Sequence, residues 1–415
     1  MVIRGEIEFP GDKSISHRAL MFAALAPGES LIKNLSTGHD IQSTINCLKA
    51  CGIDIKDNNK DLIVKGGSFS DPKEPLNCGN SGTTARLMFG LLAGEGIHAK
   101  FIGDNSLSSR PMDRIMIPLS KMGLKYKSTN GKLPVTIEQS DLIGIDHKSA
   151  ISSAQLKSAL LLAGLGANGK TIVREPLKSR DHTEIMLLEM GAKIHTDGFS
   201  TFVEPQSSGL RPMEMSIPGD PSSAAFFVAA AAMLPGSDFL IKNILINPTR
   251  VELFHHLEKM GVEIKYIDTF QKAGESIGSL VISHRELSSI TLNEQDIPGV
   301  IDELPILAIL ATQASGTTIV KGASELRVKE CDRINAICVN LNKMGGDIIE
   351  LEDGFKINGP TKLHGAKIET FHDHRIAMAF AIAGLITTQG VILDNPECSS
   401  TSFPEFYDEL ERVCQ

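Results

Sequence analysis

The chain repeats one short stretch that decides its fold, Leu257-Glu-Lys-Met-Gly-Val-Glu-Ile264. A close copy is Leu341-Asn-Lys-Met-Gly-Gly-Asp-Ile348, and weaker copies begin at Leu48, Leu119 and Leu187. The glycines of the five copies, Gly52, Gly123, Gly191, Gly261 and Gly345, are separated by 71, 68, 70 and 84 residues. Each copy is typical of a helix that ends before a glycine with positive φ and then leads into a strand.

A second pattern repeats out of phase with the first one. In each copy a polar cluster opens a helix rich in Ala and Leu, and this helix ends near a Gly before a β-branched strand. The copies start near Ser14, Asn80, Ser152, Pro218, Asp302 and His372. Six units of about 70 residues therefore account for the whole chain.

The two ends of the chain predict how the units are grouped. The last helix, 406–413, has no strand after it, whereas the strand-like stretch 2–9 has no partner, so we expect 2–9 to complete the sixth unit. The chain would then cross between two lobes near Gly11–Lys13 and Ile217–Asp220, where Pro-Gly-Asp turns occur. The predicted lobes are 13–217, and 1–12 with 218–415, each holding three units.

Several of the expected helices are apolar nearly all round, among them 156–165 and 224–234. Such helices lie inside a domain rather than on its face. The predicted fold class is therefore α/β, with two lobes that each form an inside-out α/β barrel, in which parallel helices are buried under a skin of sheet.

Composition excludes several classes of function. The net charge of −9 and the pI of about 5.8 argue against general affinity for nucleic acid or an anionic membrane. No cationic and apolar leader follows Met1, and the most apolar segments, 224–234 and 376–386, are shorter than a membrane span. The seven cysteines include no CxxC pair. We therefore expect a reduced, cytoplasmic protein without a disulfide framework.

A metal site receives little support. His372 and His374 would share one face if they lay on a strand, but no third ligand is evident. The glycine-rich stretch at Asn80 is not a phosphate-binding Walker loop, and no G-x-G-x-x-G opens a helix after a strand. We therefore expect neither a metal nor a nucleotide cofactor.

Polar residues open all six buried helices, and basic residues gather at the same places. Ser, Thr, Asn and Asp there are also ordinary N-caps, and a stretch such as 329–333 can equally be a solvated helix face. If the units of a lobe are related by rotation, however, their helix N-termini point the same way and favour anions. The basic residues at these openings are Lys13, Arg18, Arg110, Lys329, Arg333 and Arg375. We expect a cleft between the lobes that binds two small phosphorylated anions.

The ordered set of these motifs resembles the 5-enolpyruvylshikimate-3-phosphate (EPSP) synthase family over essentially the whole chain. The motifs are Pro10-Gly-Asp-Lys-Ser-Ile-Ser-His-Arg18, Leu76-Asn-Cys-Gly-Asn-Ser-Gly-Thr-Thr84, Arg110-Pro111, Ser153-Ala-Gln155, Ser179-Arg-Asp-His-Thr-Glu184, Asp302-Glu303, Arg327-Val-Lys-Glu-Cys-Asp-Arg333 and Asp373-His-Arg375. The resemblance implies two lobes of three βαβαββ units. It also implies a monomer that closes on its substrates without a cofactor, so the two crossings become hinge candidates.

The family transfers the enolpyruvyl group of phosphoenolpyruvate to the 5-hydroxyl of shikimate 3-phosphate, a step toward chorismate and the aromatic amino acids. The resemblance places shikimate 3-phosphate on Lys13, Ser14, Arg18, Ser152, Ser153, Gln155, Ser179, Arg180, Asp302 and Lys329. It places phosphoenolpyruvate on Lys13, Asn80, Gly82, Arg110, Gln155, Arg333 and Arg375. Asp302 would accept the hydroxyl proton, Glu330 would exchange a proton with the methylene carbon, and Lys13 would assist the leaving phosphate.

Two positions depart from one group of family members, which carries Asn in place of Glu325 and Lys in place of Thr401. The first removes one expected contact to shikimate 3-phosphate, and the second removes one to phosphoenolpyruvate.

Two other classes of protein share parts of this pattern. The sister enzyme that transfers enolpyruvate to UDP-N-acetylglucosamine carries a reactive Cys in the loop before Arg-Pro, whereas loop 103–111 here contains none. Ring-shaped DNA clamps also consist of six repeats, but a clamp needs a basic inner surface, which the acidic pI argues against.

Overall fold

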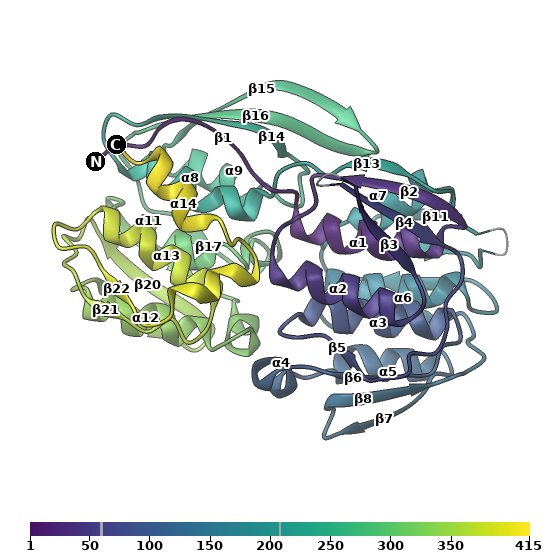
Figure 1. Ribbon diagram of the computed structural model, residues 1–415. Helices are drawn as coiled ribbons and strands as arrows, with labels where there is room; N and C mark the ends of the chain where they lie inside the picture. Colours follow the sequence, from purple (N-terminus) through teal and green to yellow (C-terminus); the bar gives the residue numbers. More distant parts are fainter. Residues whose placement is uncertain (59–60, 207–208) are drawn as a thin grey trace. The chain divides into compact units, whose positions relative to one another are not determined.

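The computed structural model describes residues 1–58, 61–206 and 209–415 (Figure 1). The chain divides into two compact units. The C-terminal unit consists of Met1–Pro10, Pro218–Lys272 and Ser276–Gln415, and the N-terminal unit consists of Gly11–Ile217 and Ala273–Glu275. The predicted lobes, by comparison, kept all of 218–415 together.

The N-terminal unit contains three four-stranded sheets of one pattern. In strand order they are β13 (Glu214–Ser216), β2 (Gly28–Lys33), β4 (Asp61–Gly66) and β3 (Asp54–Asn58); β5 (Leu76–Asn77), β6 (Ala99–Ile102), β8 (Lys132–Glu138) and β7 (Lys125–Thr129); and β9 (Asp146–Lys148), β10 (Thr171–Arg174), β12 (Ser200–Val203) and β11 (Ile194–Asp197). In each sheet the first pair is parallel and the other pairs are antiparallel.

Helices fill the space between these sheets, as Figure 1 shows for α1 and α3. The helices of this unit are α1 (Lys13–Leu25), α2 (His39–Ala50), α3 (Gly82–Gly94), α4 (Asn105–Ser109), α5 (Asp113–Lys121), α6 (Ala154–Leu165) and α7 (His182–Glu189). Almost every residue of α1, α3 and α6 is buried. Because these helices are apolar on all sides, only the interior of the unit can accommodate them.

The C-terminal unit repeats this plan with one reduced sheet. Its sheets are β1 (Arg4–Glu8), β14 (Asp238–Leu245), β16 (Glu275–Ser283) and β15 (Glu263–Lys272); β17 (Thr291–Leu292), β18 (Gly316–Val320), β20 (Gly354–Gly359) and β19 (Asp347–Leu351); and the pair β21 (Lys367–Ile368) and β22 (Ile392–Leu393). Its helices are α8 (Pro221–Met233), α9 (Glu252–Lys259), α10 (Ile297–Val300), α11 (Leu304–Ala311), η1 (Ser324–Val328), α12 (Arg333–Lys343), α13 (His374–Leu385), η2 (Pro396–Thr401) and α14 (Phe406–Val413).

The expectation that 2–9 completes the sixth unit is wrong. β1 instead pairs in parallel with β14, the strand of the fourth unit, with Arg4 opposite Asp238. Toward the last helix, an isolated bridge joins Ile3 to Cys414, and Arg412 donates to the carbonyl oxygen of Glu6. Phe9, just after β1, anchors this strand because its ring packs edge-on against Phe227 of α8 at 5.2 Å.

The two crossings therefore exchange edge strands. β1 precedes α1 of the N-terminal unit in sequence but lies in a sheet of the C-terminal unit, whereas β13 precedes α8 but pairs with β2 of the N-terminal unit. Both strands occupy the same place in their sheets, parallel to the strand that follows the first buried helix. The periodicity of the sequence predicts that such a strand exists, but it does not predict in which copy of the repeat the strand pairs.

The repeated glycines behave as predicted. Gly52, Gly123, Gly191, Gly261 and Gly345 all have positive φ, between +80° and +104°. Each lies two residues after the end of its helix, and a strand begins two or three residues later. The helix-to-strand corner is thus confirmed in all five copies, because its geometry depends on local chain conformation alone. No helix within the described ranges is long and apolar enough to cross a membrane.

Candidate active site

The N-termini of three buried helices converge in the N-terminal unit. Asp12, Ser81 and Ser153 are the N-caps of α1, α3 and α6, and each side chain accepts a hydrogen bond from a backbone N–H of the first turn. The reading of these polar residues as N-caps is therefore right. The first turns of α3 and α6 also lie side by side, because Gln155 Nε2 donates to Thr83 Oγ1 at 3.0 Å.

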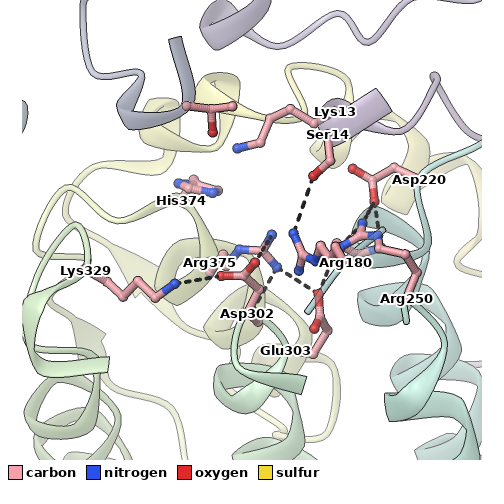
Figure 2. A network of polar contacts seen from close by, with 12 residues as sticks. Lys13, Ser14, Arg180, Asp220, Arg250, Asp302, Glu303, Lys329, His374 and Arg375 are labelled. Atoms are coloured by element: carbon pink, nitrogen blue, oxygen red, sulfur yellow. Dashed lines mark hydrogen bonds and ion pairs between the residues drawn. The ribbon is translucent and has the colours of Figure 1, made fainter. Parts of the chain in front are cut away.

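The first two turns of α1 carry Lys13, Ser14 and Arg18. Lys13 Nζ lies 3.1 Å from Asp40 Oδ2 of α2. The guanidinium of Arg18 is only 3% exposed and donates through Nη1 to the carbonyl oxygen of Ser14 at 2.9 Å. Arg180 Nη1 donates to Ser14 Oγ at 3.4 Å (Figure 2). The structure therefore brings Lys13, Ser14, Arg18 and Arg180 together.

The first turn of α3 forms a second group with two arginines. Arg86 Nη1 donates to Gln155 Oε1 at 2.8 Å, and Arg110 Nη2 donates to Asn80 Oδ1 at 2.7 Å. A Cβ atom added to Gly82 would lie 3.0 Å from Arg86 Nη1 and 3.5 Å from Arg110 Nη1. A side chain at this position would therefore crowd the end of Arg86 and contact the end of Arg110.

The remaining predicted residues of this unit lie around the start of α6 and α7. Ser152 Oγ donates to the carbonyl of Leu177 at 2.8 Å, which joins the loop before α6 to the loop before α7. Ser179 Oγ is buried and has no hydrogen-bond partner among the described residues. The predicted residues of this unit, from Lys13 to Arg180, thus all lie at helix starts or in the loops that lead into them.

Three helix N-termini also converge in the C-terminal unit. Asp220 and Asp373 cap α8 and α13 with their side chains, whereas Glu303 occupies the N-cap of α11 without such a bond. Glu303 Oε1 instead accepts from Ser222 Oγ at 2.5 Å and from Arg375 Nη1 at 3.3 Å. These bonds tie the starts of α8, α11 and α13 together.

Asp302 lies at the centre of this second group. Its Oδ1 atom lies 3.5 Å from both Lys329 Nζ and Arg333 Nη1, and its carbonyl oxygen accepts from Arg375 Nη1 at 2.8 Å (Figure 2). Glu330 Oε2 lies 2.6 Å from Arg333 Nη2. The structure therefore places both predicted acid–base carboxylates on one guanidinium, in a partly exposed position.

Burial and charge act in opposite directions on Arg333. Burial alone would lower the pKa of this 1%-exposed guanidinium, but Asp373, Glu330 and Asp302 together raise the pKa well above its ordinary value. Asp373 is fully buried, which would raise its pKa, yet Arg333 holds the pKa below its ordinary value. Arg333 therefore remains a permanent cation between three carboxylates.

At His17, one turn into α1, burial and the neighbouring charges act in the same direction and favour the neutral ring. Burial, reinforced by the charges of Lys13 and Arg18, holds the pKa of His17 well below its ordinary value. Its Nδ1 atom lies 2.7 Å from Thr44 Oγ1, which in turn lies 2.7 Å from Thr84 Oγ1 of α3. This neutral chain of hydrogen bonds connects α1 to α3 through α2.

Sequence reasoning missed two residues of these groups. Arg86 is 7% exposed and binds Gln155, and Glu303 is 4% exposed and binds Arg375, but neither was assigned a role. A charged residue one turn into an otherwise apolar helix was the available signal for Arg86. For Glu303 the signal was the longer side chain of Glu at a position where Ser or Asp caps the other buried helices.

His372 and His374 do not lie on a strand, and the predicted helix opening near His372 is confirmed. His372 has φ of +56° in a turn, and its Nδ1 atom lies 2.9 Å from Asn395 Nδ2, whereas His374 is the first residue of α13. The two rings therefore do not share a strand face. Within residues 1–58, 61–206 and 209–415, no group of three or more His, Cys, Asp or Glu side chains is placed to hold a metal ion.

Comparison with solved structures identifies the class of protein. EPSP synthase from Acinetobacter baumannii superposes with a TM-score of 0.87 at 38% identity, covering 99% of this chain and 96% of that one. The enolpyruvyl transferase NikO from Streptomyces tendae shares the fold alone, with a TM-score of 0.79 at 16% identity over 99% and 95% of the two chains. The predicted fold is thus confirmed as that of the enolpyruvyl transferases.

Sequence comparison narrows this class to one family. A sequence model described as EPSP synthase (3-phosphoshikimate 1-carboxyvinyltransferase) matches residues 2–410. The 3-phosphoshikimate 1-carboxyvinyltransferase of Persephonella marina is 45% identical over 420 residues, 99% of this chain and 97% of that protein. That of Bacillus licheniformis is 44% identical over 419 residues, 100% and 98% of the two chains. The chain belongs to the EPSP synthase family.

Proposed function

We propose that this protein transfers the enolpyruvyl group of phosphoenolpyruvate to the 5-hydroxyl of shikimate 3-phosphate and releases phosphate. The observation that carries this proposal is the gathering of basic side chains and carboxylates at the starts of buried helices in each unit. Membership of the EPSP synthase family supports the choice of substrates. The bonds broken and formed are C–O bonds, so the reaction asks for proton transfer and charge neutralisation.

The N-terminal unit supplies most of the anion-binding groups. Helix N-termini and buried cations both favour phosphate and carboxylate groups. We assign shikimate 3-phosphate to Lys13, Ser14, Arg18, Ser152, Ser153, Gln155, Ser179 and Arg180, with Asp302 and Lys329 from the C-terminal unit. We assign phosphoenolpyruvate to Lys13, Asn80, Gly82, Arg110, Gln155, Arg333 and Arg375. The arginines offset the charges of two anions that must react with each other.

The carboxylates of the C-terminal unit carry the proton transfers in this proposal. Asp302 accepts the proton of the attacking hydroxyl as this oxygen adds to the central carbon of the enol. Glu330 delivers a proton to the terminal carbon and removes one again when the tetrahedral intermediate collapses. Lys13 assists the departing phosphate as an acid. Arg333 orients both carboxylates, since it contacts Asp302 at 3.5 Å and Glu330 at 2.6 Å.

We further propose that the protein acts as a monomer in the cytoplasm, and that its two units are the lobes that close on the substrates. All seven cysteines are free, which agrees with a reducing compartment.

The deciding experiment mixes the purified protein with shikimate 3-phosphate and phosphoenolpyruvate and follows phosphate release. Omission of either substrate should abolish release. UDP-N-acetylglucosamine, the acceptor of the sister enzyme, is the matched alternative. It should give no phosphate release, because loop 103–111 lacks the cysteine of that enzyme. Release with that acceptor and none with shikimate 3-phosphate would overturn the proposal.

A further inference from the structure

A buried ionic cluster lies next to the groups assigned to shikimate 3-phosphate. Lys157 of α6 contacts Glu175 Oε2 at 2.8 Å and Glu184 Oε1 at 2.7 Å, and the three side chains are 3%, 4% and 10% exposed. Burial alone would lower the pKa of Lys157, but Glu184 and Glu175 together raise it. A buried ionic cluster of this kind rarely makes a protein more stable than apolar packing would, so stability alone does not explain its presence.

The first connection to the site runs through Glu175. Its second oxygen, Oε1, accepts a hydrogen bond at 3.0 Å from the backbone N–H of Ser153. Ser153 is the N-cap of α6, and Gln155 lies in the first turn. The carboxylate of Glu175 therefore makes two contacts with α6. It accepts a hydrogen bond at the N-cap, Ser153, and it pairs with Lys157 one turn further along the helix.

The second connection runs through α7. Glu184 is the third residue of α7, and the segment just before this helix carries Ser179 and Arg180. Lys157 and Glu184 therefore form a cross-link between α6 and α7. A cavity of about 230 Å³ borders all three members of the cluster. Apart from Lys157 and Glu175, this cavity is lined by α7, the segment before it and residues 194–201, so the cluster lies at its edge.

A second cross-link lies beside the first and reaches Arg18. Ser158 follows Lys157 and Thr183 precedes Glu184, and their hydroxyl oxygens lie 2.6 Å apart. Arg18 donates through Nη2 to Ser158 at 2.7 Å and through Nε to Thr183 at 2.8 Å. The spacing of α6 and α7 thus determines where the guanidinium of Arg18 is held.

We propose that Lys157, Glu175 and Glu184 are positioning residues for the binding of shikimate 3-phosphate, an inference that rests on the proposed function. They fix the start of α6, which carries Ser153, and the start of α7, which follows Ser179 and Arg180. Through the second cross-link they also fix the position of Arg18. None of the three touches the substrate. Arg110, Arg333 and Arg375, assigned to phosphoenolpyruvate, lie outside the contacts of this cluster.

The test compares Glu175→Leu, Glu175→Gln and the wild type in the phosphate-release assay, with KM determined for each substrate. Glu175→Leu should raise KM for shikimate 3-phosphate by about 10-fold or more and KM for phosphoenolpyruvate by a smaller factor, because only Gln155 of the residues at the start of α6 is assigned to both substrates. Glu175→Gln keeps an acceptor for the Ser153 N–H, so its KM for shikimate 3-phosphate should lie between the values of the wild type and Glu175→Leu. The matched control is Asp146→Asn, which removes the exposed ion pair with Arg174, the residue before Glu175. It should change neither KM.

Stability is measured on the same samples by thermal unfolding. If Glu175→Leu does not fold, the combined variant Lys157→Met, Glu175→Gln and Glu184→Gln replaces it, because removing all three charges leaves no unpaired ion buried. This variant should show the same selective rise in KM. A lower melting temperature with both KM values unchanged would overturn the positioning role. Absence of phosphate release by the wild type would instead overturn the proposed function.

Discussion

Arg333 is the residue on which the proposed chemistry depends most. Its side chain contacts Asp373 at 2.7 Å, Glu330 at 2.6 Å and Asp302 at 3.5 Å. Asp373 also caps α13 through the backbone N–H of Arg375 at 2.8 Å. One buried cation therefore connects the helix cap to both carboxylates that we assign to proton transfer. A misplaced Arg333 would disturb binding and catalysis together.

Removal of either carboxyl charge should slow turnover without unfolding the protein. Asp302 and Glu330 are partly exposed, so Asp302→Asn and Glu330→Gln keep their packing. We expect each variant to lower kcat by about 100-fold or more, because a positioned acid or base contributes that much. Phosphate release under saturating substrates measures the effect. Asp347→Asn, an exposed carboxylate bound to Asn358, is the control that should keep full turnover. Near-normal kcat in both test variants would refute the acid–base assignment.

The buried His17 should make stability depend on pH. In the unfolded chain its pKa has the ordinary value of about 6.5, whereas the folded protein holds the pKa well below this value. As the pH falls below about 6.5, the unfolded chain therefore binds a proton that the folded chain does not bind. Stability should decrease on acidification by up to about 1.4 kcal/mol per pH unit. Urea unfolding of the wild type and His17→Gln between about pH 7.5 and 5.5 tests this. If the free energy of unfolding fell equally with decreasing pH in the wild type and in His17→Gln, the prediction would be contradicted.

At the scale of single elements, helix boundaries were the most predictable part of the fold. N-caps such as Asp12 and Ser153 and helix-ending glycines such as Gly261 are visible in sequence, because a cap depends on residues three or four positions away. The start of α11 differs because the bond of Glu303 to Ser222 is a long-range contact. The site residues follow the same division. Those at or near helix starts were found through motifs, whereas Arg86 and the members of the Lys157 cluster depend on partners 18 to 69 residues away.

The close approach of α3 and α6 should be sensitive to a single methyl group. A Cβ atom on Gly90 would lie 2.0 Å from the carbonyl oxygen of Ala159, which is backbone and cannot move aside. We expect Gly90→Ala to lower the free energy of unfolding by roughly 1–3 kcal/mol or more. Gly384→Ala is the control, since its Cβ would lie 3.0 Å from a Val391 methyl group and no closer than 3.5 Å to backbone of that residue. Chemical denaturation compares the two, and equal stability for both variants would contradict the packing argument.

At the scale of the whole molecule, the chain passes between its two units at Pro10–Gly11 and at Ile217–Pro218, apart from the short turn Ala273–Glu275. Both connections carry a Pro-Gly-Asp turn. The spacing of the motifs predicted these crossings, because the turn chemistry is local. It did not predict the partner of β1, because the choice between equivalent sheets is made by non-local packing such as that of Phe9 on Phe227.

Substrate binding should make the protein more compact if the two connections act as hinges. We expect the radius of gyration from solution scattering to fall when shikimate 3-phosphate is added. The control is shikimate without phosphate, which lacks the charge that the assigned cations bind. An unchanged scattering profile at saturating shikimate 3-phosphate would count against hinge motion.

The exchange of β1 and β13 limits how this protein can be dissected. A fragment that starts at Pro218 would lack β1 and would leave the long edge of β14 without its partner, inviting association with other chains. A fragment that stops before Glu214 would likewise leave β2 bare. If the gene is split between Ile217 and Pro218, the first piece carries both β13 and β1, so the second piece depends on the first for the strand that covers β14 and should stay in solution only when the two are co-expressed.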